Sequence, residues 1–130
     1  MEPMLLKPAG KNYLWGGMRL KTEFNKKLPV FPLAETWECS AHPDGLSVIV
    51  NGEFAGHTLR EVLELHPEFL GDKIDKRYGL PILAKLIDAE KSLSIQVHPG
   101  DEYARKHEND FGKTEMWYVL DADDTAFLVH

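Results

Sequence analysis

The chain has 130 residues, of which 43% are hydrophobic and 28% charged, and its formal net charge is −6. This composition is typical of a soluble globular domain of ordinary size and excludes a disordered chain. The negative charge argues against general nucleic-acid binding, which needs basic surface. No stretch approaches the ~20 apolar residues that span a bilayer, and the start lacks a signal-peptide pattern, so a cytoplasmic protein without membrane partners is expected.

The cysteine content limits the kinds of site that the chain can hold. Cys39 is the single cysteine, which excludes an internal disulfide and a Cys-x-x-Cys zinc site. Any metal site must therefore use nitrogen and oxygen ligands. No repeat or low-complexity tract interrupts the sequence, and a single domain over residues 1–130 is predicted.

The first ninety residues predict short strands and one well-defined helix. Residues 1–40 are rich in proline and glycine, which favours loops and short extended pieces. Residues 46–56 read as a strand that leaves through an Asn51-Gly52 turn. Thr58-Leu-Arg-Glu61 matches a capping box, which predicts a helix that starts there and ends before Gly71. Residues 81–89 predict a further strand.

The remaining residues predict three more strands and one short helix. Residues 92–99 alternate strictly, with Leu93, Ile95 and Val97 on one face. A helix is expected to open at Asp101, and residues 113–121 and 125–130 are rich in the aromatic and branched residues that strands prefer. Because the last predicted strand stops at His130, the sequence suggests a chain truncated at that point.

Three polar side chains on the predicted strands could grip one metal ion. Gln96 and His98 lie two residues apart, so in a strand they project from the same side about 6 to 7 Å apart. Glu115, an inward polar residue among aromatics, could add a carboxylate oxygen. Nitrogen and oxygen ligands suit Zn²⁺, Fe²⁺, Mn²⁺ or Ni²⁺, and the residues alone leave that choice open. A lone histidine in a strand is more often structural than a ligand.

Several segments in order resemble the type I mannose-6-phosphate isomerases. The metal-site signature of that family is similar to Ser94-Ile-Gln-Val-His-Pro99 followed by Gly112-Lys-Thr-Glu-Met-Trp-Tyr-Val-Leu120. Trp15-Gly-Gly, Glu35-Thr-Trp-Glu-Cys-Ser-Ala-His42, Val50-Asn-Gly-Glu-Phe-Ala-Gly56 and Leu80-Pro-Ile-Leu-Ala-Lys-Leu-Ile-Asp88 also resemble family segments. The resemblance therefore covers nearly the whole chain.

The resemblance implies a fold, a cofactor and a set of site residues. The fold would be mainly β with a few helices, a cupin-like double-stranded β-helix (jelly-roll barrel), incomplete in this N-terminal portion. One Zn²⁺ ion would be bound at the positions of Gln96, His98 and Glu115, with a fourth ligand, a histidine, beyond residue 130. Lys113 would line the sugar-phosphate pocket and act in catalysis, and Ser94 would lie near the substrate phosphate.

The same resemblance implies an aldose–ketose isomerase that interconverts mannose 6-phosphate and fructose 6-phosphate, with a small sugar phosphate as its partner. Two other hypotheses remain open. The first is a cupin module that binds sugar or metal without turnover, or an inactive fragment. The second is a metal-dependent cupin of other chemistry, such as an oxygenase. The sequence leaves the oligomeric state undetermined.

Other polar and aromatic residues have structural explanations. Glu35, Glu38 and His42 could suggest a second metal cluster, but carboxylates that cap backbone N–H groups are common in such segments. The family resemblance implies that Trp37 and its neighbours form a pocket wall or its support. Trp15, Trp37 and Trp117 could face a sugar, but at least two of the three are expected to pack in the core. Structural or solvated roles are expected for the remaining histidines that precede residue 130, namely His57, His66 and His107.

Overall fold

The computed structural model describes residues 2–129. The chain forms two compact units that meet between Ser92 and Leu93, and each is described by itself. The expectation of a single domain over residues 1–130 stays a prediction. Among the described residues, no helix has the length and apolar character needed to cross a membrane.

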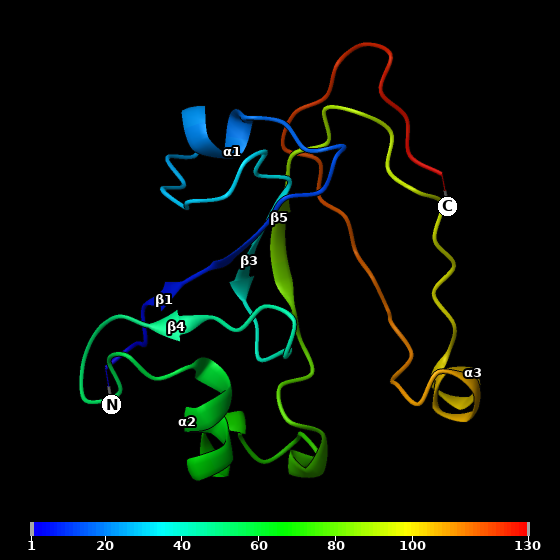
Figure 1. The fold of residues 1–130 in the computed structure, drawn as a ribbon. Helices are drawn as coiled ribbons and strands as arrows, with labels where there is room; N and C mark the ends of the chain where they lie inside the picture. Colours follow the sequence, from blue (N-terminus) through cyan, green and yellow to red (C-terminus); the bar gives the residue numbers. More distant parts are fainter. Residues whose placement is uncertain (1, 130) are drawn as a thin grey trace. The chain divides into compact units, whose positions relative to one another are not determined.

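The first unit contains two small antiparallel sheets and most of the helical turns (Figure 1). One sheet pairs β1 with β4, and the other has the order β2-β3-β5 with β3 in the centre. The bounds are β1 Leu6–Lys7, β2 Ala9–Lys11, α1 Arg19–Thr22, β3 Glu35–Cys39, β4 Val48–Ile49, α2 Leu59–Leu65, η1 Pro67–Leu70, η2 Lys76–Tyr78 and β5 Ala84–Ile87. The short strands expected before residue 40 are confirmed.

The core of this unit gathers around the central strand β3 and helix α2. The buried apolar side chains are Leu20, Leu33, Ala34, Trp37, Ile49, Leu59, Val62 and Leu70. They come from strands, loops and helices that are distant in the sequence, and burial of this apolar surface is the main force that holds the short strands together.

Two of the predicted strands in this unit are present but shorter than expected. The segment 46–56 contains β4, and Gly52 after it has a φ of 66°, as the predicted Asn51-Gly52 turn requires. The segment 81–89 contains β5, which pairs with β3. Both predictions are therefore confirmed at their centres, while the flanking residues lie outside the ladders.

The capping box predicted at the start of α2 is present. The Thr58 side chain accepts a hydrogen bond from Glu61 N, and the Glu61 carboxylate accepts one from Thr58 N at 2.8 Å. These two bonds satisfy backbone N–H groups that the first helical turn would otherwise leave unpaired. On the buried face, Leu59 and Val62 join the core.

The capping box predicts a pH-dependent contribution to stability. Hydrogen bonds from Thr58 to the carboxylate lower the pKa of Glu61 below that of an ordinary glutamate. A group with a lowered folded-state pKa stabilises the fold above its unfolded pKa of about 4.3, and this contribution is lost as the pH falls through the folded value. We therefore expect urea unfolding to show a steeper loss of stability between about pH 5 and 3 for the wild type than for Glu61→Gln.

Thr58→Ala tests the same cap at neutral pH. Loss of a threonine N-cap costs about 1 kcal/mol of unfolding free energy, which urea titration at pH 7 would measure.

The control for the pH profile of Glu61→Gln is Glu64→Gln on the same helix. The Glu64 carboxylate pairs with Arg60 at 2.8 Å instead of capping the helix, so this variant should keep the steep acid profile. Equal pH profiles for wild type and Glu61→Gln would contradict the prediction.

A glycine pair between α1 and the preceding loop allows two segments to approach closely. Gly16 forms an antiparallel bridge with Ala89, and the carbonyl of Trp15 accepts hydrogen bonds from Glu90 N and Lys91 N, both at 3.0 Å. The buried Asp88 carboxylate accepts a hydrogen bond from Arg19 N at 2.7 Å. The Trp15-Gly-Gly motif therefore holds this loop against the segment that follows β5.

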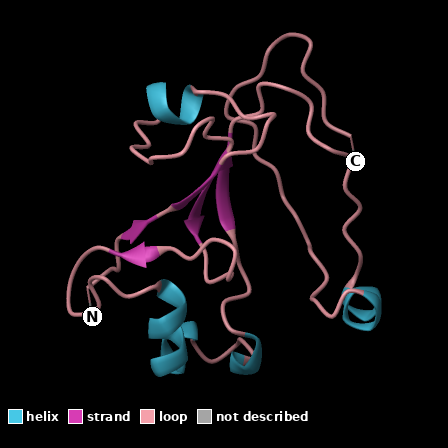
Figure 2. Ribbon diagram, viewed as in Figure 1, coloured by secondary structure: helices cyan, strands magenta, loops and turns pink. Residues whose placement is uncertain are grey.

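The second unit contains one helix, α3 (Asp101–His107), which starts at the predicted residue. The strands predicted over 92–99, 113–121 and 125–129 are wrong for this structure: these described residues form no ladder, and Figure 2 shows them as loop. His130, the last residue of the third prediction, lies outside the described residues. A strand needs a hydrogen-bonded neighbour as well as an alternating pattern, and here the side chains of Ile95 and Val97 are 87% and 88% exposed.

Candidate metal centre

Two segments of the second unit are joined at the beginning of α3. Lys113 N donates a hydrogen bond to the carbonyl of Pro99 at 3.3 Å, and Gly112 N donates one to the Asp101 carboxylate at 2.9 Å. These bonds connect the residues that follow His98 to the residues that precede Glu115. The backbone around α3 therefore brings the two segments with the predicted ligands together.

His98, Lys113 and Glu115 form a contiguous polar cluster. His98 Nε2 lies 3.0 Å from Glu115 Oε2, and Lys113 Nζ lies 3.8 Å from Glu115 Oε1. The side chains of His98 and Glu115 are 24% and 31% exposed. Each carboxylate oxygen thus faces a different partner in a partly buried site.

The Glu115 carboxylate is held in its charged form. Burial raises the pKa of Glu115, but a hydrogen bond from the Trp117 side chain, the charge of Lys113 and the hydrogen bond and charge of His98 outweigh it, and the net pKa lies below that of an ordinary glutamate. The expectation that at least two of the three tryptophans pack in the core did not include this contact of Trp117. The sequence could have indicated this contact, because Trp117 carries an N–H donor and lies two residues after Glu115.

The other two predicted site residues contact each other. Gln96 Nε2 donates a hydrogen bond to Ser94 Oγ at 3.2 Å. Because the amide nitrogen makes this bond, the amide oxygen of Gln96 remains available as a metal ligand. The structure therefore contains two contacting groups, Ser94 with Gln96, and Glu115 with His98 and Lys113.

The donor set can be tested against the requirements of zinc. Two ligands about 2.0–2.1 Å from a tetrahedral zinc ion lie roughly 3.3 Å apart, whereas His98 Nε2 and Glu115 Oε2 are in direct hydrogen-bond contact at 3.0 Å and would separate slightly to admit an ion. No cluster of three or more His, Cys, Asp or Glu suited to a metal occurs among residues 2–129. His98 and Glu115 could supply one imidazole nitrogen and one carboxylate oxygen to a zinc ion, while the Gln96 amide, the third predicted ligand, is hydrogen-bonded to Ser94. The ligand roles stay predictions.

Gly112 allows the two segments of the site to meet. A Cβ atom at this position would lie 2.4 Å from Asp101 N and 2.6 Å from Gly100 C. These are backbone atoms, so the chain itself would have to move. We expect Gly112→Ala to separate Glu115 from His98 and to weaken zinc binding about 10-fold, since misplaced outer-shell support typically costs 10- to 100-fold in metal affinity.

Zinc affinity of Gly112→Ala is measured by competition with a chromophoric chelator. Gly100→Ala is the matched control, because a Cβ there meets nothing within 4 Å and its φ of −71° suits alanine. Equal affinities for Gly112→Ala and the control would show that the close approach does not position the site.

The two carboxylates considered for a second metal cluster pair with other side chains, and His42 Nδ1 accepts a hydrogen bond from Asp44 N at 3.2 Å. The buried Glu35 accepts a hydrogen bond from Trp37 Nε1 at 2.7 Å and pairs with Lys85 Nζ at 3.3 Å. Glu38 pairs with Lys26 at 2.8 Å. Glu35 and Glu38 therefore pair with other side chains, and the expectation that they cap backbone N–H groups is wrong. Side chains two residues apart in strand β3, such as Glu35 and Trp37, lie on the same face and can contact each other.

Trp37 is buried, whereas Trp15 is only partly buried and Trp117 is 46% exposed. The expectation that at least two of the three tryptophans pack in the core is therefore wrong, because the segment around Trp117 packs against no sheet among the described residues. Lys11 Nζ and Lys85 Nζ lie 4.3 Å and 4.8 Å from the centre of the Trp37 ring, distances at which an ammonium group is attracted to an indole face. Gly45 lies against the same ring, since a Cβ there would be 2.6 Å from an indole carbon. Trp37 therefore supports the sheet of the first unit.

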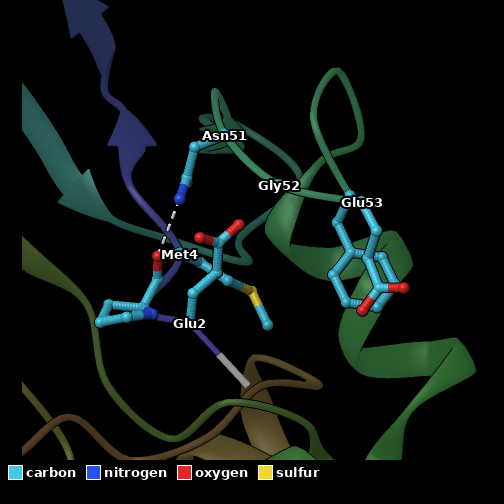
Figure 3. A pocket seen from close by; sticks show the side chains of 7 residues that line it. Glu2, Met4, Asn51, Gly52 and Glu53 are labelled. Atoms are coloured by element: carbon cyan, nitrogen blue, oxygen red, sulfur yellow. Dashed lines mark hydrogen bonds between the residues drawn. The ribbon is translucent and has the colours of Figure 1, made fainter.

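A pocket in the first unit lies between the N-terminal segment and the turn after β4 (Figure 3). Asn51 connects the two, because its Nδ2 donates to the carbonyl of Pro3 at 3.0 Å and its Oδ1 accepts from Leu5 N at 2.6 Å. The lining residues are Glu2, Pro3, Met4, Asn51, Gly52, Glu53 and Phe54. None of the predicted site residues lines this pocket.

Comparison with known proteins assigns the family. Residues 4–125 match the family described as phosphomannose isomerase type I, catalytic domain. The chain belongs to this family. It is 46% identical over 129 residues to a probable mannose-6-phosphate isomerase of Bacillus subtilis and 42% identical over 129 residues to a mannose-6-phosphate isomerase of Streptococcus mutans. These matches cover 98% and 99% of this chain and 40% of each relative.

A solved structure agrees with the fold as well. The crystal structure of a mannose 6-phosphate isomerase from Bacillus subtilis matches with a TM-score of 0.89 and 40% identity, covering 97% of this chain and 40% of that one. The mainly β, cupin-like fold class, incomplete in this chain, is therefore confirmed. The chain spans 40% of the length of these relatives and corresponds to their N-terminal portion.

Proposed function

We propose that this chain provides part of the active site of a zinc-dependent isomerase that interconverts mannose 6-phosphate and fructose 6-phosphate. The observation that supports this most directly is the contact between His98 Nε2 and Glu115 Oε2 at 3.0 Å, beside Lys113, in a member of the phosphomannose isomerase family. The segments that meet there are those that the sequence analysis selected for metal binding.

In this proposal one zinc ion is held by Gln96, His98 and Glu115. When bound, zinc supplies Lewis-acid stabilisation of negative charge on the sugar oxygens. Glu115 contributes the single negative charge of the ligand set and His98 a neutral nitrogen. Because the Gln96 amide is neutral, the bound ion would keep about one net positive charge, which favours an anionic intermediate.

The remaining predicted residues would handle the substrate. Isomerisation moves a proton between C1 and C2 of the opened sugar through an enediol, so anionic oxygen needs a nearby cation. Lys113, whose side chain is 45% exposed and anchored beside Glu115, would stabilise that oxygen or take part in proton transfer. Ser94, in contact with Gln96, would contact the substrate phosphate.

The chain matches 40% of each relative's length, and this bears on its zinc affinity and turnover when it is studied alone. We propose that a fourth zinc ligand and further phosphate-binding groups come from the portion that this chain does not match. The 130 residues alone should then show weak zinc binding and little or no turnover. The sugar-phosphate partner, the absence of nucleic-acid partners and the cytoplasmic location stay predictions.

The test is a chimera in which residues 1–130 replace the matching portion of the Streptococcus mutans relative, which is 42% identical. Conversion of mannose 6-phosphate to fructose 6-phosphate is measured with zinc, with a chelator, and with His98→Ala. We expect turnover that the chelator and the substitution both abolish. A folded chimera that binds zinc without turnover would contradict the proposal.

A second candidate function is a module that binds a sugar phosphate or metal without turnover. It is favoured by the His98–Lys113–Glu115 cluster itself, whose imidazole, ammonium and carboxylate groups can bind a metal or an anion without a reaction. Zinc-dependent retention of mannose 6-phosphate by the 130-residue chain, together with an inactive chimera, would support this alternative.

A further inference from the structure

The Glu115 carboxylate faces two nitrogen partners at once, the His98 imidazole and the Lys113 ammonium group. Oε2 faces His98 Nε2 at 3.0 Å, and Oε1 faces Lys113 Nζ at 3.8 Å. A carboxylate that ligates a metal ion donates electron density from these same oxygens. Any ion that binds Glu115 must therefore share the carboxylate with Lys113.

Backbone contacts fix where the Lys113 side chain starts. Lys113 N donates a hydrogen bond to the carbonyl of Pro99, the residue next to His98. The neighbouring Gly112 contacts Gly100 and Asp101 so closely that no Cβ fits. The backbone of Lys113 is therefore fixed beside the His98–Glu115 pair, and its ammonium group reaches to 3.8 Å from Glu115 Oε1.

We infer that Lys113 opposes metal binding and so sets the affinity of the His98–Glu115 site for a divalent cation. Lys113 reduces the negative potential at Glu115 and repels a doubly charged ion, because like charges near the carboxylate raise the free energy of the bound state. This role rests on the proposed metal site and is separate from any contact of Lys113 with substrate.

The exposure of the Lys113 side chain limits how much it can weaken metal binding. The Lys113 side chain is 45% exposed, so solvent screens its interaction with Glu115, and exposed ion pairs are individually weak. Removing the charge should therefore tighten metal binding by about 1.5- to 5-fold rather than by orders of magnitude. Salt should reduce the difference, since the Debye length falls from about 30 Å at 0.01 M to about 10 Å at 0.1 M.

The experiment measures the affinity of the 130-residue chain for Zn²⁺ by chelator competition and for Co²⁺ by its visible absorption, at two salt concentrations. The variants are Lys113→Gln, Lys113→Arg and, as a matched charge control on α3, Lys106→Gln. We expect tighter binding in Lys113→Gln alone, and a smaller gain at 0.1 M salt than at 0.01 M.

The outcomes separate this inference from the proposed function. Metal binding that His98→Ala abolishes, with equal or weaker affinity in Lys113→Gln, would overturn the inference and leave the metal site standing. The same gain in Lys106→Gln would also overturn it, because it would then reflect net charge. A chain with no His98-dependent binding of either ion would overturn both the metal site and this role of Lys113.

Discussion

Gly16→Ala is expected to lower the free energy of unfolding of the first unit by about 3 kcal/mol or more, the upper range for an overpacked site. A Cβ at Gly16 would lie 2.3 Å from Ala34 Cβ and 2.5 Å from Ala34 Cα. Since one of these atoms belongs to the backbone, no rotamer change relieves the clash. The loop would have to move away from Ala89, with which Gly16 forms its bridge.

Urea unfolding followed by tryptophan fluorescence measures this change. Adding Ala34→Gly to Gly16→Ala removes the opposing methyl group but leaves the Cα and N of residue 34 in place. The double variant should therefore recover little stability. A loss below about 0.5 kcal/mol in Gly16→Ala, as for an ordinary surface substitution, would contradict the close approach.

His98→Ala is expected to lower zinc affinity by about 100-fold or more, because a lost ligand should cost at least as much as the outer-shell partners whose removal costs 10- to 100-fold. His98 supplies the imidazole nitrogen that faces Glu115 at 3.0 Å. Chelator competition on the 130-residue chain measures the affinity.

His107→Ala is the matched control for this prediction. His107 lies in the same unit, at the end of α3, and stacks on Tyr103 with ring centres 4.3 Å apart. It should keep wild-type zinc affinity. If His98→Ala and His107→Ala bound zinc as the wild type does, the ion would be held elsewhere and the proposed ligand set would be wrong.

Local chemistry made several parts of the fold predictable. Thr58 and Glu61 satisfy each other's backbone N–H groups within four residues, so the start of α2 could be predicted from the sequence pattern. The Asn51-Gly52 turn and the beginning of α3 at Asp101 depend on equally short-range preferences. Such features require no distant partner, and the structure contains all three.

The strands expected after residue 92 show the limit of that reasoning. Alternation over 92–99 fixes which side chains share a face, but a ladder also needs a neighbouring strand. None of the described residues supplies one to this segment. The alternating pattern is therefore present in the sequence without the strand pairing that it predicts. The chain matches 40% of its relatives' length.

The sequence by itself determined the family, the candidate ligands and the local helix starts, because these depend on residue types at short spacing. The tertiary structure decided which of those ligands meet: the contact of His98 with Glu115 spans seventeen positions and depends on Gly112 against Gly100 and Asp101. It also decided that each Glu115 oxygen faces a different partner. Contacts of this kind follow from how backbone segments approach in space, which periodicity does not encode.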